Sequence, residues 1–271
     1  MVSATLILMI ILAVLMVIVG GATGLRAFLS IILNFAVLFV NIALISWGFP
    51  ALTVTIISSL VILAITIFMG SDDDQITQNA FYSSVLVLVV LIGLILIIHP
   101  HLMIQGFGNE NNEDLEGMSL LIGIKFSDVI TSTMIISSLG AVAEASIAVS
   151  TGIQELIETT PDLDLTKLFS HGYEIGKEII GTALNTLFFG FFGSFLGLFI
   201  WYVKLNYRFS EFFNNKIFAA EFSMILIGFI GVISTVPLTA WVTQLRVRRN
   251  PGKTWGLTEL RDQLLNPQLV P

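Results

Sequence analysis

Long apolar runs constrain this chain more than any other feature. A helix that crosses a bilayer needs about 20 mostly apolar residues, at about 1.5 Å of rise per residue. Seven stretches meet this requirement, and they are residues 4–20, 25–47, 51–69, 80–98, 127–150, 175–203 and 217–243. Only 11% of the residues are charged, whereas soluble domains carry roughly a quarter. The sequence therefore predicts an all-α fold, a polytopic transmembrane helix bundle of about seven spanning helices.

Turn residues separate these segments. Glycines between positions 20 and 24 divide the first two, Pro50 is placed to begin the third, and residues 71–74 form an acidic turn. Two longer connections are a polar loop at 105–117 and a mixed stretch at 152–172, where we expect short interfacial helices. The predicted division is a transmembrane bundle over residues 1–249 and a polar cytoplasmic tail over residues 250–271.

Basic residues near the helix ends predict the orientation. Cytoplasmic ends of spanning helices are enriched in Lys and Arg, and the last segment is followed by Arg246, Arg248, Arg249 and Lys253. The C-terminus is therefore expected in the cytoplasm, and seven crossings would place the N-terminus outside. The basic residues that this topology leaves outside are Lys204, Arg208 and Lys216, so the rule holds on balance only.

Composition and missing motifs argue against several functional classes. The chain has no cysteine, which excludes thiolate catalysis and cysteine metal sites. Its formal charge of -7 does not suggest a nucleic-acid surface. It contains no P-loop, nucleotide fingerprint or GxSxG motif, and its apolar segments contain no internal Asp or His for an intramembrane protease. We expect no enzymatic activity, cofactor, metal or nucleic-acid partner.

Glu144 is the main candidate for a functional residue. If 127–158 is one helix, Glu144 lies about 24 Å from Asp128 and about 16 Å from Glu155 along its axis, deep in the membrane. An acid there costs about 2.5 kcal/mol or more, so it is by default a functional hypothesis. Steps of three or four place it on one helix face with Thr133, Ser137, Gly140, Ala148, Thr151 and Glu155. Such a face lines a tight helix contact or a watery path, and a break at residues 139–141 would expose backbone groups there, making the helix discontinuous.

A second polar face is predicted on the next spanning segment. Glu174, Glu178, Gly181 and Asn185 are spaced by three or four residues, and Lys177 beside them could pair with a carboxylate. The acids and Lys177 are equally consistent with an interfacial salt-bridge cluster. In the second segment, Asn34 and Asn41 are one heptad apart. The asparagines favour hydrogen bonds between helices over ligand binding, and a protonated Glu144 could serve the same structural purpose.

Three motifs resemble the YibE/F-like family of bacterial membrane proteins. They are GIKFSD at 123–128, LGAVAEASIA at 139–148 and IGKEIIGTALNTL at 175–187. In the family pattern the Leu-Gly-Ala stretch is followed by acids, and here those positions are Ala143 and Glu144, so only one acid is carried over. This departure argues against a two-carboxylate mechanism.

The resemblance also has implications for location and partners. It implies a multi-pass protein of the bacterial plasma membrane. Full-length members resemble this protein with an extra extracytoplasmic domain after the first helix, where this chain has only residues 21–24. The chain thus looks like the short member of a two-gene pair, which implies a paralogous YibE/F-like membrane subunit as partner. A homo-oligomer is the alternative.

The leading functional hypothesis is a transporter or permease subunit that moves a small solute or ion. Glu144 would handle the proton or cation, and the residues expected to line its path are Ser137, Thr151, Glu178, Thr182 and Asn185. The alternative is a membrane scaffold or regulatory subunit that does not transport, in which the polar faces are interfaces. An intramembrane enzyme ranks third, because no nucleophile or metal constellation is present.

Overall fold

The computed structural model describes residues 4–102, 104, 125–160 and 167–249, and this part of the chain contains helices and no strand. The helices are α1 (Ala4–Ser46), α2 (Ala51–Gly70), α3 (Asp74–Leu102), α5 (Phe126–Thr159), α6 (Leu168–Lys204), α7 (Phe209–Asn214) and α8 (Lys216–Arg249). Six of them, all but α7, are long and apolar enough to cross a membrane. The predicted all-α membrane fold is confirmed.

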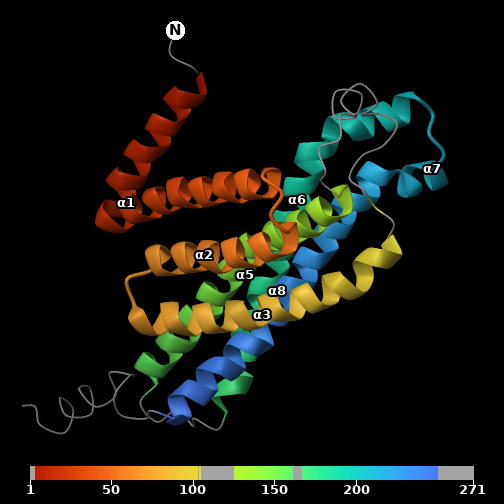
Figure 1. Cartoon of the computed structure of the whole chain (residues 1–271). Helices are drawn as coiled ribbons and strands as arrows, with labels where there is room; N and C mark the ends of the chain where they lie inside the picture. Colours follow the sequence, from red (N-terminus) through yellow and green to blue (C-terminus); the bar gives the residue numbers. More distant parts are fainter. Residues whose placement is uncertain (1–3, 103, 105–124, 161–166, 250–271) are drawn as a thin grey trace, which may run out of the picture.

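Helix α1 contains the first two predicted segments as two arms. A straight helix of its 43 residues would be about 65 Å long, roughly twice the hydrocarbon thickness of a bilayer. The chain instead turns at Gly21, whose φ of 55° and ψ of -131° suit only glycine. A Cβ on Gly24 would collide with the backbone carbonyl of Met16. The glycines between positions 20 and 24 thus form the predicted break, and Figure 1 shows the arms diverging from it.

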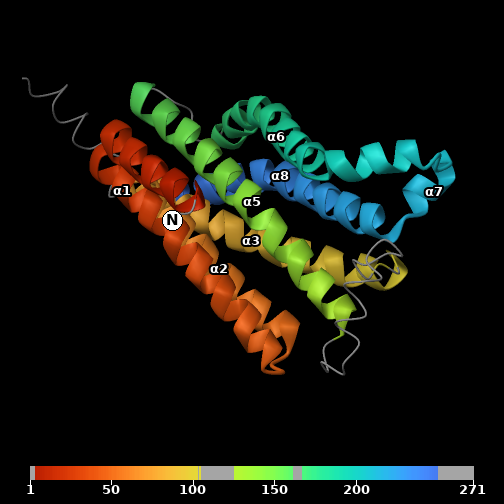
Figure 2. The same cartoon turned by 90° about the horizontal axis from the view of Figure 1, so that it is seen from above.

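Helices α3, α5 and α8 pack against one another at the centre of the bundle, with α2 and α6 on either side of α5. The second arm of α1 packs on α2 (Figure 1). Small residues permit the central approach, because a Cβ on Gly231 would lie only 3.0 Å from Leu91 and 3.1 Å from Val142. In the view of Figure 2, α5 lies toward the reader between α2 and α6. One face of α5 is therefore left without a covering helix in the described structure.

Several helices extend past the predicted apolar segments. Helix α3 begins at Asp74, because the Asp73 carboxylate caps it by accepting the backbone N–H groups of Gln75 at 2.6 Å and Ile76 at 3.0 Å. Hydropathy cannot detect such polar end turns. Helix α5 likewise continues to Thr159 through part of the stretch where short interfacial helices were expected. It is also unbroken at 139–141, so the discontinuity considered there is absent.

The short helix α7 was not predicted. Its start is fixed by Glu211, whose carboxylate accepts the Arg208 backbone N–H at 2.8 Å. Aromatic rings join it to its neighbours, with Phe212 lying 5.6 Å from Phe199 of α6 and 4.4 Å from Phe218 of α8 between centroids. The predicted polar loop at 105–117 and the predicted tail at 250–271 lie outside the described residues.

Candidate functional site

The polar stripe predicted around Glu144 lies on the outside of α5. Its exposed members, which we call the outer face of α5, are Thr133, Ser137, Gly140, Glu144, Thr151 and Glu155, whereas Ala148 is half-buried. The helical spacing thus predicted one face correctly. That face points away from the interior of the bundle, and no helix contact is made through it in the described structure.

The neighbours of the outer face are α2 on one side and α6 on the other. Ile147 of α5 approaches α2, since a Cβ on Gly70 would lie 3.8 Å from its Cδ1 atom. Gly152 of α5 approaches α6, since a Cβ there would lie 2.7 Å from Cγ2 of Ile175. The outer face lies between these two contact lines, on the side that Figure 2 shows uncovered. Glu144 is therefore open to whatever surrounds the single chain.

The predicted residues of α6 are also exposed. Glu174, Glu178, Thr182 and Asn185 all lie on the surface of the bundle. Lys177 donates to Glu174 across 2.7 Å and lies 4.9 Å from the ring centre of Tyr173. The ion-pair interpretation of Lys177 is thus confirmed for Glu174.

Helical register decides which of these side chains border the outer face of α5. Ala183 packs against α5 and α8 in a small apolar cluster. At about 100° per residue, Thr182 lies about 20° from Ile175, the residue that contacts α5, and Glu178 about 60° from it. Asn185 lies about 80° from Ile175 on the same side, and only about 20° from Glu178. Thr182 therefore lies nearest the outer face of α5, and Glu178 and Asn185 lie further round α6 on the same side.

A cleft of about 300 Å³ opens between α5, α6 and α8 at the end of the bundle where α7 lies. Its polar lining comes from Ser137, Thr186, Ser194 and Glu221. Ser137 also belongs to the outer face of α5, so the cleft and the outer face share a side chain. Glu221 is half-buried and was not among the predicted site residues, because it is close to the start of its apolar segment.

A second set of polar residues, which the sequence reasoning missed as a group, lies inside the bundle. The hydroxyls of Ser84 and Ser146 form a hydrogen bond of 2.7 Å between α3 and α5. The other buried polar residues of α3, α5 and α8 include Asn79, Ser83, Ser138, Ser150, Gln154, Thr235, Thr239 and Thr243. Ser146, Ser150 and Gln154 recur every four residues, as do the three threonines. This signal was available in the sequence, but spacing alone does not reveal which polar face is buried.

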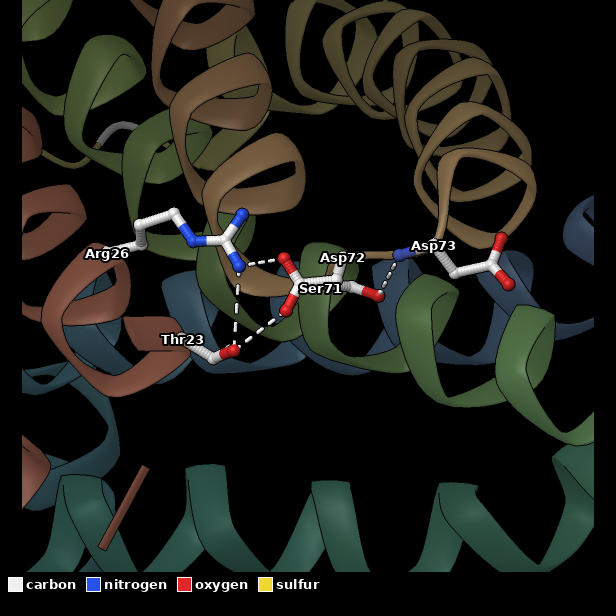
Figure 3. Close-up of polar contacts among 5 residues, drawn as sticks. All are labelled: Thr23, Arg26, Ser71, Asp72 and Asp73. Atoms are coloured by element: carbon white, nitrogen blue, oxygen red, sulfur yellow. Dashed lines mark hydrogen bonds and ion pairs between the residues drawn. The ribbon is translucent and has the colours of Figure 1, made fainter. Parts of the chain in front are cut away.

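The remaining polar contacts hold helices together. The Asn34 amide donates to Thr66 across 2.8 Å, which confirms its predicted interhelical role, and Asn41 is buried. At the turn between α2 and α3, Asp72 accepts a hydrogen bond of 2.7 Å from Thr23 and forms an ion pair with Arg26 (Figure 3). Within the described ranges, no three His, Asp or Glu side chains gather closely enough to hold a metal ion.

A family model described as YibE/F-like protein matches residues 8–249. The chain belongs to the YibE/F-like family. The match confirms the suspected resemblance and extends it from three motifs to nearly every helix of this YibE/F-like protein, from α1 to the end of α8. Searches of the curated proteins and of the solved structures find no match.

Proposed function

We propose that this YibE/F-like protein is a membrane transport subunit that moves a small solute or ion along the outer face of α5, with Glu144 as the binding carboxylate. The observation that carries this proposal is the position of Glu144, exposed at the middle of a 34-residue helix. Lipid is a poor neighbour for this side chain, since an acid at the bilayer centre costs about 2.5 kcal/mol or more. Water or another polypeptide must therefore face it.

The polar groups around Glu144 support a path along the membrane normal. The cleft with Ser137 and Glu221 lies toward one end of α5, and Thr151 and Glu155 continue the outer face toward the other end. Glu178 and Thr182 of α6 border the same side by register. A second chain covering the open side would convert this line into an enclosed route. The paralogous subunit implied by the family resemblance, or a second copy of this chain, fits that position.

Ion movement can be tested in proteoliposomes that contain a pH-sensitive dye. The full chain, reconstituted with any subunit that co-purifies with it, is expected to dissipate an imposed proton gradient. Glu144→Gln should abolish this flux, because the amide cannot exchange a proton, while leaving the purified protein folded. Asp128→Asn is the matched control, since it removes a carboxylate from the exposed first turn of the same helix, away from the outer face. Equal flux in wild type and Glu144→Gln would refute the assignment.

The second candidate function is a scaffold subunit that does not transport. Its supporting observation is the small-residue content of the exposed faces, because a Cβ added to Gly140 of α5 or to Gly181 of α6 would have no heavy atom within 4 Å and small residues let helices approach closely. In that case the outer face would be a dry contact with a partner helix.

Thiol labelling separates the two functions, because the chain has no cysteine of its own. Gly140→Cys places a thiol on the outer face, and Val89→Cys places one on an exposed apolar position of α3. In native membranes, a water-soluble maleimide that labels only the outer-face thiol supports a hydrated path. Protection of that thiol until the complex is dissociated by detergent supports the scaffold.

A further inference from the structure

A cleft between α3 and α8 contains two arginines near the end of α8. Its volume is about 440 Å³, and its described lining is Tyr82, Val242, Leu245, Arg246 and Arg249. It is formed where the first turns of α3 meet the last turns of α8. Tyr82 is 56% exposed and Trp241, one turn before Leu245, is 46% exposed. Exposed Tyr and Trp at helix ends are typical of the headgroup region.

Neutral side chains hold the Arg246 guanidinium in place. It donates to Oδ1 of Asn79 across 2.8 Å and to Oε1 of Gln78 across 2.6 Å, and its Cζ atom lies 5.2 Å from the Tyr82 ring centre. A guanidinium has five N–H donors, so further donors are left for a ligand. The amide partners orient the group without cancelling its charge.

The acids of the neighbouring turn do not neutralise the two arginines. Within the described residues, neither Arg246 nor Arg249 forms an ion pair with a carboxylate. Asp72 pairs with Arg26, and Asp73 caps the start of α3. Asp74 lies one turn before Gln78 on α3 and is exposed. The cleft thus combines a fixed guanidinium, a second exposed arginine and an apolar wall.

We propose that this cleft binds the phosphate of an anionic phospholipid, with Arg246 and Arg249 as the phosphate ligands. Arginine matches phosphate oxygens in geometry as well as charge. Val242 and Leu245, on the side of the cleft toward the membrane interior, provide a surface for the acyl chains. Basic pockets between helices at the membrane surface are suited to such headgroups. A free phosphate would use the same arginines but not the apolar wall.

Lipid retention in the purified full chain tests this site. The protein in mild detergent is mixed with phosphatidylglycerol or phosphatidylcholine, and bound lipid is counted by native mass spectrometry. Wild type should retain phosphatidylglycerol over phosphatidylcholine. Arg249→Gln and Arg246→Gln should each retain about fivefold less, the factor expected for one basic residue near a charged membrane surface. Arg248→Gln removes the same charge from an exposed position outside the described lining and should leave retention unchanged.

The other outcomes of the lipid-retention experiment either support or overturn the proposed site. Arg249 is exposed, so Arg249→Gln is the variant expected to keep its fold, and size-exclusion chromatography verifies this. Competition by inorganic phosphate that displaces the lipid only at millimolar concentration supports the lipid as ligand. Complete displacement at micromolar phosphate identifies a soluble phosphate as the ligand and overturns the lipid. Equal retention in Arg248→Gln and Arg249→Gln, or no preference between the lipids, overturns the site.

Discussion

Helix α5 carries two polar faces with opposite surroundings. The inner face includes Ser138, Ser146 and Ser150, which are buried against neighbouring helices. The outer face includes Ser137 and Glu144, which are exposed. Only the outer face contains ionisable groups near mid-helix. Hydroxyls can satisfy themselves on the helix backbone, as Ser138 does with the carbonyl of Ile135 at 2.8 Å, so they tolerate close packing. A carboxylate needs water or a partner, and Glu144 lies where no helix of the described structure covers it.

The largest difference in stability between a packed and an exposed position is expected for two glycines of α6. A Cβ on Gly176 would lie 2.9 Å from Cγ2 of Val236 and closer still to Cγ1, whereas a Cβ on Gly181 would have nothing within 4 Å. We expect Gly176→Leu to destabilise the fold by about 3 kcal/mol through overpacking. Gly181→Leu should change stability by less than about 0.5 kcal/mol.

Unfolding of the purified proteins in mixed detergent micelles, followed by circular dichroism, measures this difference. The sharper result would be a well-folded Gly181→Leu protein that has lost flux or partner association, which would place a functional surface on α6. Similar losses of stability in both variants would show that α6 packs differently from the structure described above.

Adjacent serines on α5 give the next largest contrast. Ser138 is fully buried, whereas its neighbour Ser137 is exposed beside the cleft. Ser138→Leu should lower the free energy of unfolding by about 2 kcal/mol, because the added methylenes have no space. Ser137→Leu should leave stability within about 0.5 kcal/mol and narrow the cleft that contains Glu221. The same unfolding assay compares them, and a more stable Ser138→Leu protein would contradict the burial of the inner face.

The hydrogen bond between Ser84 and Ser146 predicts a smaller effect. A double-mutant cycle with Ser84→Ala and Ser146→Ala should give a coupling free energy of about 0.6 kcal/mol, the average for polar pairs between membrane helices. The matched cycle pairs Ser84→Ala with Thr151→Ala on the outer face and should show no coupling. Coupling in that second cycle would mean that α3 packs against the outer face of α5, which would contradict the structure.

The sequence predicted the helices well because hydropathy and turn residues are local properties. Each of the seven predicted segments falls on a helix, and the break near Gly21 occurs where glycines cluster. The helix ends were less accurate, since polar turns such as the capped start of α3 continue past the apolar run. The inner and outer faces of α5 could not be assigned from spacing. Both repeat every three or four residues, and only packing against α3, α6 and α8 distinguishes them.

The candidate site shows the same limit. Glu144 and Ser137 were correctly placed on one face. Lys177 was correctly predicted to pair with a carboxylate, which is that of Glu174. Asn185 was grouped with Glu178 by helical spacing, and both are exposed on α6 about 20° apart; spacing alone could not show that this face of α6 lies on the surface of the bundle. Arg246 was used only for topology, since its partners Gln78 and Asn79 are far away in the chain.

The smallest expected effect concerns an exposed ion pair at a turn, outside the packed bundle. The side chains of Arg26 and Asp72 are 43% and 56% exposed, and Thr23 shares the carboxylate (Figure 3). Exposed ion pairs contribute about 0–1 kcal/mol and are screened by salt. Asp72→Asn should therefore lower the free energy of unfolding by about 0.5 kcal/mol in dilute buffer and by almost nothing in 1 M salt, where the screening length is about 3 Å. Thr23→Val, which removes the hydroxyl but no charge, should show no salt dependence. A large effect of Asp72→Asn that survives high salt would mean that this turn is buried in the assembled complex, and that the second arm of α1 is part of an interface like the one proposed for α5.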